Sequence, residues 1–246
     1  MKGLLCAIRF LTVFPAGRSC GDRQDEDIAS CAVWFPVVGL VTGCVLALSY
    51  DLLYCILPLP AVCVLVLVLS VVITGGMHAD GFIDTADAIA SGADRERMLE
   101  IMREGRPGAL GIAAAILLFM SKFAFMLSLR PAAAGLSLVA MSVIGKSSFA
   151  VSGFFYRYAR QGRGLGGSIL GKVPGKSLVL SGILCTCIPA LIFGFKIFIF
   201  FPLICSVFFI CNAWLSKRLG GLTGDTLGAV SEILEGSTLL LAAVLA

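Results

Sequence analysis

The sequence predicts an all-α protein: a polytopic bundle of about seven transmembrane helices with cytoplasmic interfacial helices between them. Hydrophobic residues make up 59% of the 246 positions, and charged residues make up only 14%, against about 25% in an ordinary soluble domain. The mean hydropathy is +1.00. A soluble protein of this length could not bury so much apolar surface, so we expect residues 1–246 to form a single integral membrane domain.

The elements follow from where the apolar runs lie. A helix needs about 20 apolar residues to cross a bilayer, and seven segments meet that length. They are residues 32–56, 59–76, 109–129, 132–153, 177–195, 197–215 and 228–246. Before the first of them, the patch Leu4 to Phe14 is short, contains Arg9 and is followed by Pro15. We therefore expect it to lie at the membrane interface as an amphipathic helix.

The basic residues predict the orientation of the chain. With a cytoplasmic N-terminus, 15 of the 19 basic residues fall in cytoplasmic segments, which is the bias that the positive-inside rule describes. The three polar loops, at about 77–108, 154–176 and 216–227, then share the cytoplasmic side. We expect a multi-pass protein of the bacterial cytoplasmic (inner) membrane whose active site faces the cytoplasm, with no nucleic-acid partner.

A row of acids opens the first polar loop, directly after an apolar span. Asp80, Asp84 and Asp87 are spaced i, i+4 and i+7, which places them on one helix face within roughly 60° of arc. Like charges beside a hydrocarbon layer are costly unless a cation or water compensates them. Hard carboxylate oxygens suit Mg²⁺ or Mn²⁺. The alternative is a solvated helix whose acids merely face nearby arginines.

Small residues and a histidine surround this row. Gly75, Gly76 and Gly81 permit close approach of the backbone or a break in the helix, and we include them among the candidate substrate-binding positions. His78 is the single histidine of the chain, so a Cys/His zinc site is not expected despite the ten cysteines. His78 is a candidate general base or substrate contact; a local hydrogen-bonding role is the alternative.

Several cations are candidates for binding phosphate. Residues 94–111 predict an amphipathic interfacial helix that ends at Gly105 and Pro107. Arg103 and Arg106, near its end, could bind a phosphate bidentately. The glycine-rich stretch 162–175 is either a flexible loop or a phosphate contact; it contains Arg163. Lys146 lies near the inner end of its span and could reach the site, whereas Lys122 either has a function or snorkels to the membrane surface.

A second acidic motif precedes the last span. A glycine-rich turn, Gly220 to Gly224, leads into Asp225, and Glu232 lies seven residues further on the same helix face. This arrangement echoes the first motif. We expect the two motifs to converge on one site, with Asp225 as a further metal ligand.

Taken together, the motifs resemble the cobalamin synthase family, the adenosylcobinamide-GDP ribazoletransferases. The pieces that carry the resemblance span nearly the whole chain. They are Phe10-Leu11-Thr12 with Pro15, Phe35-Pro36-Val37-Val38-Gly39, Gly75-Gly76-Met77-His78-Ala79-Asp80-Gly81, Asp84-Thr85-Ala86-Asp87, Arg95-Glu96-Arg97-Met98-Leu99-Glu100-Ile101-Met102 and Arg218-Leu219-Gly220-Gly221-Leu222-Thr223-Gly224-Asp225.

The resemblance implies a Mg²⁺-dependent transferase that joins adenosylcobinamide-GDP to α-ribazole, or to its 5′-phosphate, and releases GMP. Membrane lipid and other enzymes of the corrinoid pathway are expected partners. We expect Asp80, Asp84 and Asp87, with Asp225, to hold the metal, and His78 or one of the aspartates to take the proton of the attacking hydroxyl. The predicted phosphate contacts are Arg103, Arg106 and Lys146, and His78, Asp84 and Arg106 are the predicted catalytic residues.

Two alternatives remain at this point. A CDP-alcohol phosphotransferase also carries a row of aspartates at a membrane surface, but its pattern has Ala-Arg where this chain has Ala86-Asp87. A cation-coupled transporter would place acids near the bilayer midplane and often shows two similar halves. Here the acids cluster at one face of the membrane and no repeat is evident, so the ribazoletransferase is the favoured interpretation.

Overall fold

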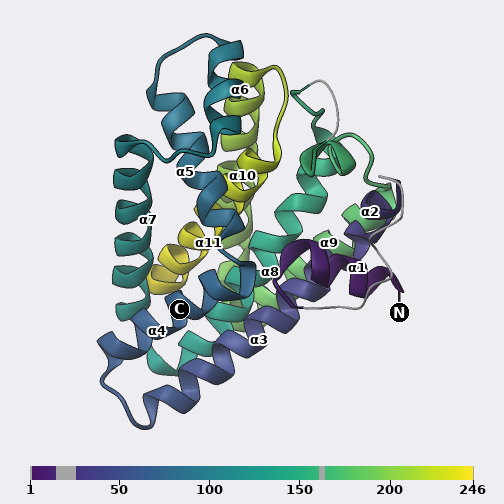
Figure 1. The fold of residues 1–246 in the computed structure, drawn as a ribbon. Helices are drawn as coiled ribbons and strands as arrows, with labels where there is room; N and C mark the ends of the chain where they lie inside the picture. Colours follow the sequence, from purple (N-terminus) through teal and green to yellow (C-terminus); the bar gives the residue numbers. More distant parts are fainter. Residues whose placement is uncertain (1, 15–25, 161–163, 246) are drawn as a thin grey trace.

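The computed structural model describes residues 2–14, 26–160 and 164–245, and within them every regular element is a helix (Figure 1). The α-helices are α1 (Lys2–Leu11), α2 (Glu26–Cys31), α3 (Phe35–Tyr54), α4 (Leu59–Thr74), α5 (Met77–Ala90), α6 (Arg95–Glu104), α7 (Ala109–Leu127), α8 (Pro131–Phe155), α9 (Gly175–Phe193), α10 (Ile197–Leu219) and α11 (Gly224–Leu245). The 3-10 turns are η2 (Ala32–Trp34), η3 (Gly166–Ser168) and η4 (Gly194–Lys196). The predicted all-α class is confirmed.

Among the described residues, five helices are long and apolar enough to cross a membrane: Ile28–Tyr54, α7, α8, Gly194–Leu219 and α11. A sixth crossing exists if α4 and α5, which are bent by 90° at their junction, form one broken span. The predicted count of seven is therefore not confirmed. Hydropathy alone registered the apolar stretches of α4 and α9, but α4 has only 16 residues and the apolar part of α9, Gly175–Leu191, is also short of a full span.

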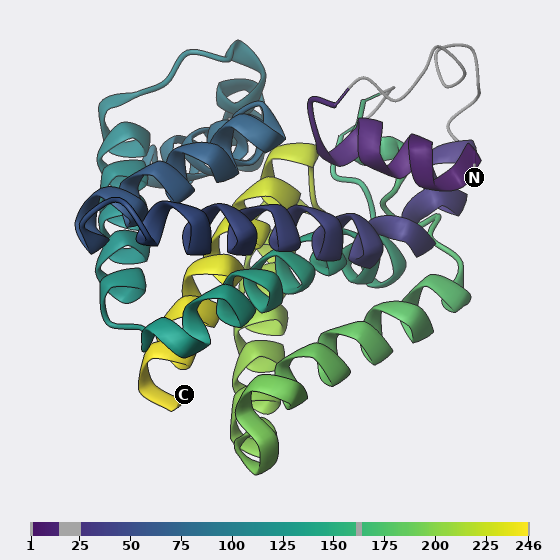
Figure 2. The ribbon, with the colours of Figure 1, turned by 90° about the horizontal axis from the view of Figure 1, so that it is seen from below.

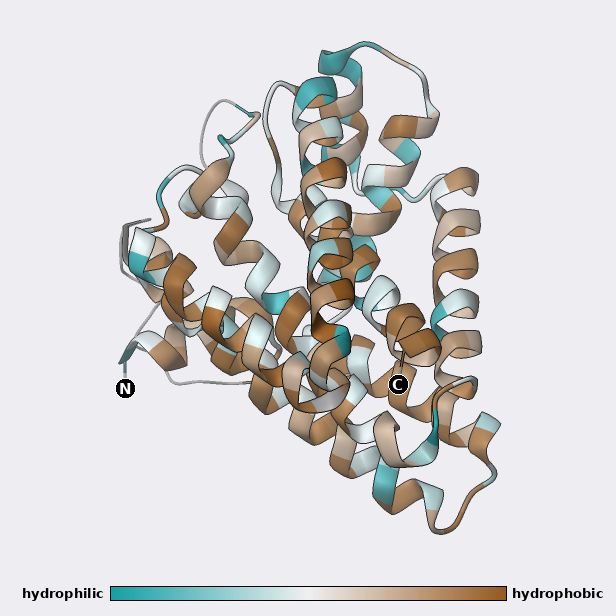
Figure 3. Ribbon diagram, turned by 180° about the vertical axis from the view of Figure 1, so that it is seen from behind, coloured by the Kyte–Doolittle hydropathy of each residue, from teal (hydrophilic) through white to brown (hydrophobic). Residues whose placement is uncertain are grey.

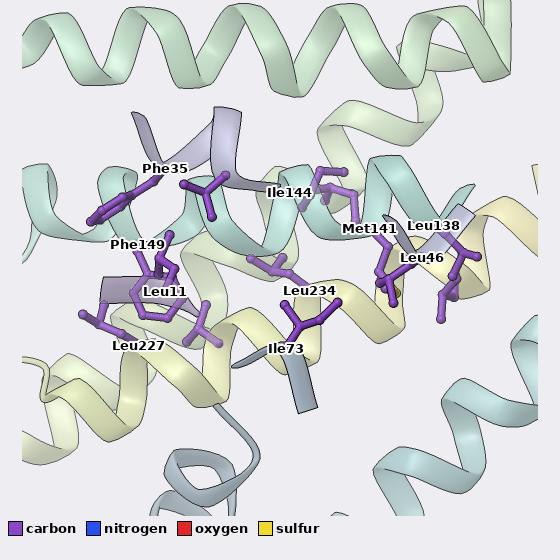
Figure 4. Packing of buried hydrophobic residues seen from close by; sticks show 14 of the residues in the cluster. Leu11, Phe35, Leu46, Ile73, Leu138, Met141, Ile144, Phe149, Leu227 and Leu234 are labelled. Carbon is purple, nitrogen blue, oxygen red and sulfur yellow. The ribbon is translucent and has the colours of Figure 1, made fainter. Parts of the chain in front are cut away.

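Helix α8 lies at the centre of the molecule, between α3 and α11 (Figure 2). The α3–α8 contact is close because Gly39 and Gly43 face α8: a Cβ at Gly39 would lie 2.7 Å from the carbonyl oxygen of Ser142. Small residues spaced by four let helix backbones approach in membranes. Around this contact, apolar side chains such as Phe35, Leu138 and Leu234 form one continuous core (Figure 4).

The outer helices and the polar end of the molecule have opposite characters. Along α7 and α10, large apolar side chains are exposed, among them Leu117, Phe198 and Ile210, as expected for helices that face lipid. Hydrophilic residues gather instead at the end where α6 and the C-terminal end of α10 lie (Figure 3). The segments that carry the two acidic motifs, α5 and the start of α11, lie toward this same end (Figure 1), and the C-terminus lies away from it.

Candidate active site

Helices α5 and α11 cross in direct contact, and the crossing brings the two acidic motifs together. A Cβ at Gly81 would lie 2.7 Å from the carbonyl oxygen of Asp225, and a Cβ at Gly228 would lie 3.1 Å from the Cα of His78. Glycine at both positions is therefore what lets the backbones approach. The predicted convergence of the two motifs is found.

Two consecutive glycines create the break that orients α5. Gly75 and Gly76 have φ values of 63° and 74°, a left-handed conformation that glycine adopts without a steric penalty. They end α4 and turn the chain by 90° into α5. The structure thus gives these two glycines a role in chain geometry; their predicted role in substrate binding stays a prediction.

A cavity of about 270 Å³ opens beside the crossing. The charged and polar part of its walls combines three distant parts of the chain: His78 and Asp80 from α5, Asp225 from α11, and Arg160 with residues 164–166 from the segment between α8 and α9. The glycine-rich loop therefore borders the site. Its residue Arg163 lies outside the described residues.

The carboxylates of α5 differ in environment. Asp80 is exposed at the cavity, whereas Asp84, one turn later, is 6% exposed. With 14 residues and a 90° turn from α4, α5 is too short to cross a bilayer alone, and we treat it as lying outside the membrane-spanning helices. Burial, followed by the charges of Asp80, Asp225 and Asp87, raises the pKa of Asp84 to about 6.

Asp87 is committed to another helix. Its Oδ2 accepts a hydrogen bond from the backbone N–H of Gly108 at 2.6 Å, and its Oδ1 accepts one from the N–H of Gly111 at 2.7 Å. These amides lie at the N-terminal end of α7, where the first N–H groups have no acceptor within the helix. A negative charge is favourable at this end of a helix. Asp87 therefore caps α7, a role that the i, i+4, i+7 spacing did not reveal.

Arg160 is a site residue that the sequence reasoning missed. Its guanidinium forms an ion pair of 2.8 Å with Oδ2 of Asp225. A short parallel pairing between Tyr158 and Leu222 holds Arg160 beside the start of α11: the N–H of Leu222 donates to Arg157 and the N–H of Ala159 donates to Leu222, both at 2.8 Å. Arg160 lies two residues before the glycine-rich stretch 162–175, and that basic stretch was the nearest signal in the sequence.

Beneath the cavity lies a buried network of ionic side chains. The Nζ of Lys122 donates to Glu232 at 2.5 Å and to Glu235 at 2.9 Å. The Nζ of Lys146 donates to the other oxygen of Glu235 at 3.0 Å and lies 3.2 Å from Nδ1 of His78. All five side chains are buried. Lys122 thus does not snorkel, and Lys146 reaches the site through the histidine.

The predicted arginines of the first polar loop lie elsewhere. Arg103 and Arg106 are exposed at the end of α6 and in the turn that follows, and neither is among the described residues that line the cavity. Arg95, at the start of α6, instead donates to the carbonyl oxygens of Leu219 and Ala159 at 2.7 and 2.8 Å. It ties α6 to the segments that carry Arg160 and Asp225.

Comparison with known protein families identifies the family of the chain. The family model described as cobalamin-5-phosphate synthase matches residues 3–243. The chain belongs to this family. It is 34% identical over 241 residues to the adenosylcobinamide-GDP ribazoletransferase of Thermoanaerobacter pseudethanolicus, a match that covers 98% of this chain and 96% of the relative.

Two further members of the family show similar relationships. The chain is 33% identical to the adenosylcobinamide-GDP ribazoletransferase of Caldanaerobacter subterraneus subsp. tengcongensis (96% of this chain, 95% of the relative). It is 34% identical to that of Clostridium novyi (96% and 94%). No solved structure matches the chain significantly. The family resemblance noted from the motifs is confirmed, and with it a transferase of cobalamin biosynthesis rather than a phospholipid enzyme or a transporter.

Proposed function

We propose that this protein joins adenosylcobinamide-GDP to α-ribazole, or to α-ribazole 5′-phosphate, with release of GMP and with Mg²⁺ as cofactor. A hydroxyl oxygen of the ribose would form a bond to the phosphorus next to the corrinoid. The bond from that phosphorus to the bridging oxygen would break, and GMP would leave with the electron pair. The hydroxyl proton would pass to a carboxylate of the site.

One observation carries the proposal: the acidic motifs of α5 and α11, the guanidinium of Arg160 and the glycine-rich residues 164–166 all border a single cavity. Transfer between a diphosphate and a hydroxyl needs all of these, namely compensation of phosphate charge, backbone amides for oxygens and a proton acceptor. At about 270 Å³, the cavity is smaller than the roughly 300–1,000 Å³ typical of sites that enclose drug-sized ligands. It therefore suits the diphosphate and its neighbouring ribose, with the corrin ring outside.

The residues present fit a magnesium ion. Among the described residues, no three His, Cys, Asp or Glu side chains are grouped closely enough to hold an ion by themselves. Mg²⁺, however, is usually bound through one or two carboxylates together with water and substrate phosphates. Asp80, exposed at the cavity, and Asp84, buried one turn further along α5, would offer two such carboxylates. Burial, followed by the negative charges of Asp80, Asp225 and Asp87, raises the pKa of Asp84, and a bound cation would offset those charges. When bound there, the ion would offset charge on the phosphoryl oxygens.

The chain's own groups would then take these roles. Arg160 would exchange part of its contact with Asp225 for a phosphate oxygen, as guanidinium groups bind both anions in the same geometry. A carboxylate of the site that is not bound to the metal would accept the hydroxyl proton. Asp87 would hold α7, and so the rest of the acidic helix, in place rather than coordinate the metal.

We further propose that the cavity faces the cytoplasm of a bacterial inner membrane, as the distribution of basic residues predicts. The C-terminus would then lie on the outer side. Alkaline phosphatase, which is active only outside the cytoplasm, tests this when fused after Ala246. An inactive fusion, with an active green fluorescent protein at the same position, would contradict the orientation.

The reaction is tested with purified protein in lipid, supplied with adenosylcobinamide-GDP, α-ribazole or its phosphate, and Mg²⁺. Chromatography follows cobalamin and GMP. We expect cobalamin and GMP to form in equal amounts and only when metal is present. For Asp84→Asn we expect a rate at least about 100-fold lower, as for loss of a charge-stabilising group in a transition state. Asp51→Asn is the matched control, because Asp51 is an exposed aspartate on α3, outside the residues that line the cavity.

Well-folded protein that makes no product from these substrates would overturn the proposal. An assay with CDP-diacylglycerol would then test the phospholipid alternative. Full activity of Asp84→Asn at unchanged Mg²⁺ concentration would retain the reaction but remove Asp84 from the site.

A further inference from the structure

The orientation of the His78 ring is fixed from one side. Its Nδ1 lies 3.2 Å from Nζ of Lys146, and its ring packs against that of Phe149 with centroids 5.0 Å apart. The two nitrogens of an imidazole point in nearly opposite directions, so Nε2 points away from Lys146. His78 lines the cavity whereas Lys146 does not, and Nε2 has no hydrogen-bond partner among the described residues. Nε2 is therefore the atom that His78 offers to a bound ligand.

The proton on this ring can be assigned from its neighbour. An ammonium group has three donors and no acceptor, so its contact with Nδ1 requires a lone pair there. In a neutral imidazole the proton must then sit on Nε2. The hydrogen-bond network thus selects one of the two tautomers.

Charge balance keeps Lys146 protonated and His78 neutral. Lys122 and Lys146 face Glu232 and Glu235, two charges of each sign in direct contact. Loss of the proton from Lys146 would leave a buried carboxylate without its counter-charge, and a proton added to His78 would place a third cation against Lys146. Both changes are costly where water is excluded.

We propose that Lys146 holds His78 in its neutral Nε2–H tautomer, so that the histidine serves the cavity as a hydrogen-bond donor to a phosphate oxygen and not as the general base. The proposal rests on the proposed function for the identity of the acceptor, but not for the tautomer itself. It removes His78 from the candidates for taking the hydroxyl proton and leaves the carboxylates. A preorganised neutral donor stabilises the charge that develops on the oxygens of the departing phosphate. Lys146 is then a positioning residue, which acts through the ring.

The first test is spectroscopic and needs no substrate. Because His78 is the single histidine among 246 residues, protein labelled with ¹⁵N-histidine and purified without a histidine tag gives signals from this ring alone. At pH 7 we expect one protonated nitrogen, assigned to Nε2, and one unprotonated nitrogen, assigned to Nδ1. A proton on Nδ1, or on both nitrogens, would overturn the proposal whatever the enzyme turns out to catalyse.

Two variants of Lys146 test the cause. Lys146→Arg retains a group that only donates, and we expect it to keep the Nε2–H tautomer. Lys146→Met removes the donor, and we expect a mixture of tautomers. An unchanged spectrum in folded Lys146→Met would show that Lys146 does not select the tautomer. If that variant does not fold, the wild-type spectrum still tests the tautomer, and a proton on Nδ1 in Lys146→Arg would overturn the role of the donor-only contact.

Two variants of the histidine test the role in turnover. The amide N–H of His78→Gln reaches the position of Nε2 and can still donate, whereas the shorter His78→Asn reaches only the position of Nδ1. We expect His78→Asn to lose about 100- to 1,000-fold in kcat, as for removal of one transition-state donor, and His78→Gln to retain at least about tenfold more activity than His78→Asn. Equal, near-complete loss in both would indicate a base. If the wild type makes no product, the tautomer result still stands while the proposed function fails.

Discussion

Asp87→Asn separates a helix-capping role from a metal-binding role. The substitution preserves the size of the side chain but replaces one carboxylate oxygen by an N–H₂ group. One of the amides of Gly108 and Gly111 then keeps a neutral acceptor, and the other faces a donor. A hydrogen bond to a charged group contributes about 1.5–3 kcal/mol, and a charge at a helix N-terminus adds a further few tenths to 1 kcal/mol. We therefore expect the first turn of α7 to lose about 2–4 kcal/mol of local stability.

Hydrogen exchange of the amides in residues 105–115 measures this loss directly, because local opening controls the exchange rate. Since each 1.4 kcal/mol is a factor of ten, exchange should be faster by about 30-fold to several hundred-fold. Asp80→Asn is the control: it removes a charge from the same helix without touching α7, and its exchange should match the wild type. Wild-type exchange in Asp87→Asn, together with a higher Mg²⁺ requirement, would refute the capping argument and make Asp87 a metal ligand.

Three further predictions concern the acidic helix and the buried network. Because the pKa of Asp84 is raised to about 6, protons should compete with the metal below that pH. The Mg²⁺ concentration for half-maximal activity should then rise about tenfold per pH unit below 6 and stay level between pH 7 and 8. A Mg²⁺ requirement that does not change with pH would exclude Asp84 as a ligand. Gly81→Ala should force α5 from the Asp225 carbonyl, 2.7 Å from the new methyl group, and lower activity at least about tenfold in folded protein. Gly182→Ala, which meets nothing within 4 Å, is its control, and equal activities would contradict the close crossing. Lys122→Met should destabilise the protein by about 3–5 kcal/mol, because it leaves two buried carboxylates with one counter-charge; an unchanged denaturation midpoint in detergent would show that the carboxylates are protonated.

The sequence predicted the two acidic motifs because each depends on a local pattern, and the similarity of the two motifs predicted that they converge. Helical spacing places Asp80 and Asp84 on one face, and glycines mark the positions where backbones meet. The capping of α7 by Asp87 could not be predicted in this way. It depends on the amides of Gly108 and Gly111, about 20 residues away, and a spacing rule describes one helix rather than the helix packed against it.

The same limit explains why Arg160 was missed. Its position depends on the pairing of Tyr158 with Leu222, which joins residues more than 60 positions apart and has no periodic pattern. The predicted span count was not confirmed, for a related reason. Hydropathy measures the length of an apolar run, and the 90° turn at Gly75 and Gly76 was visible only as two adjacent glycines.

The buried ions raise the question of why an apolar bundle contains them at all. Replacing a buried ion pair with well-packed apolar residues is often neutral or stabilising, because desolvation offsets much of the attraction between the charges. The network of Lys122, Glu232, Glu235 and Lys146 is therefore not explained by the stability of the fold. Its last contact is with His78, whose other nitrogen is offered to the cavity. The ammonium of Lys146 alone beside the histidine would be a costly unpaired charge, and Glu235 neutralises it. Glu235 also contacts Lys122, whose own charge is balanced by Glu232. On this reasoning, the charges are balanced so that one donor-only group can be buried against Nδ1, and the network serves the ring of His78 rather than the bundle.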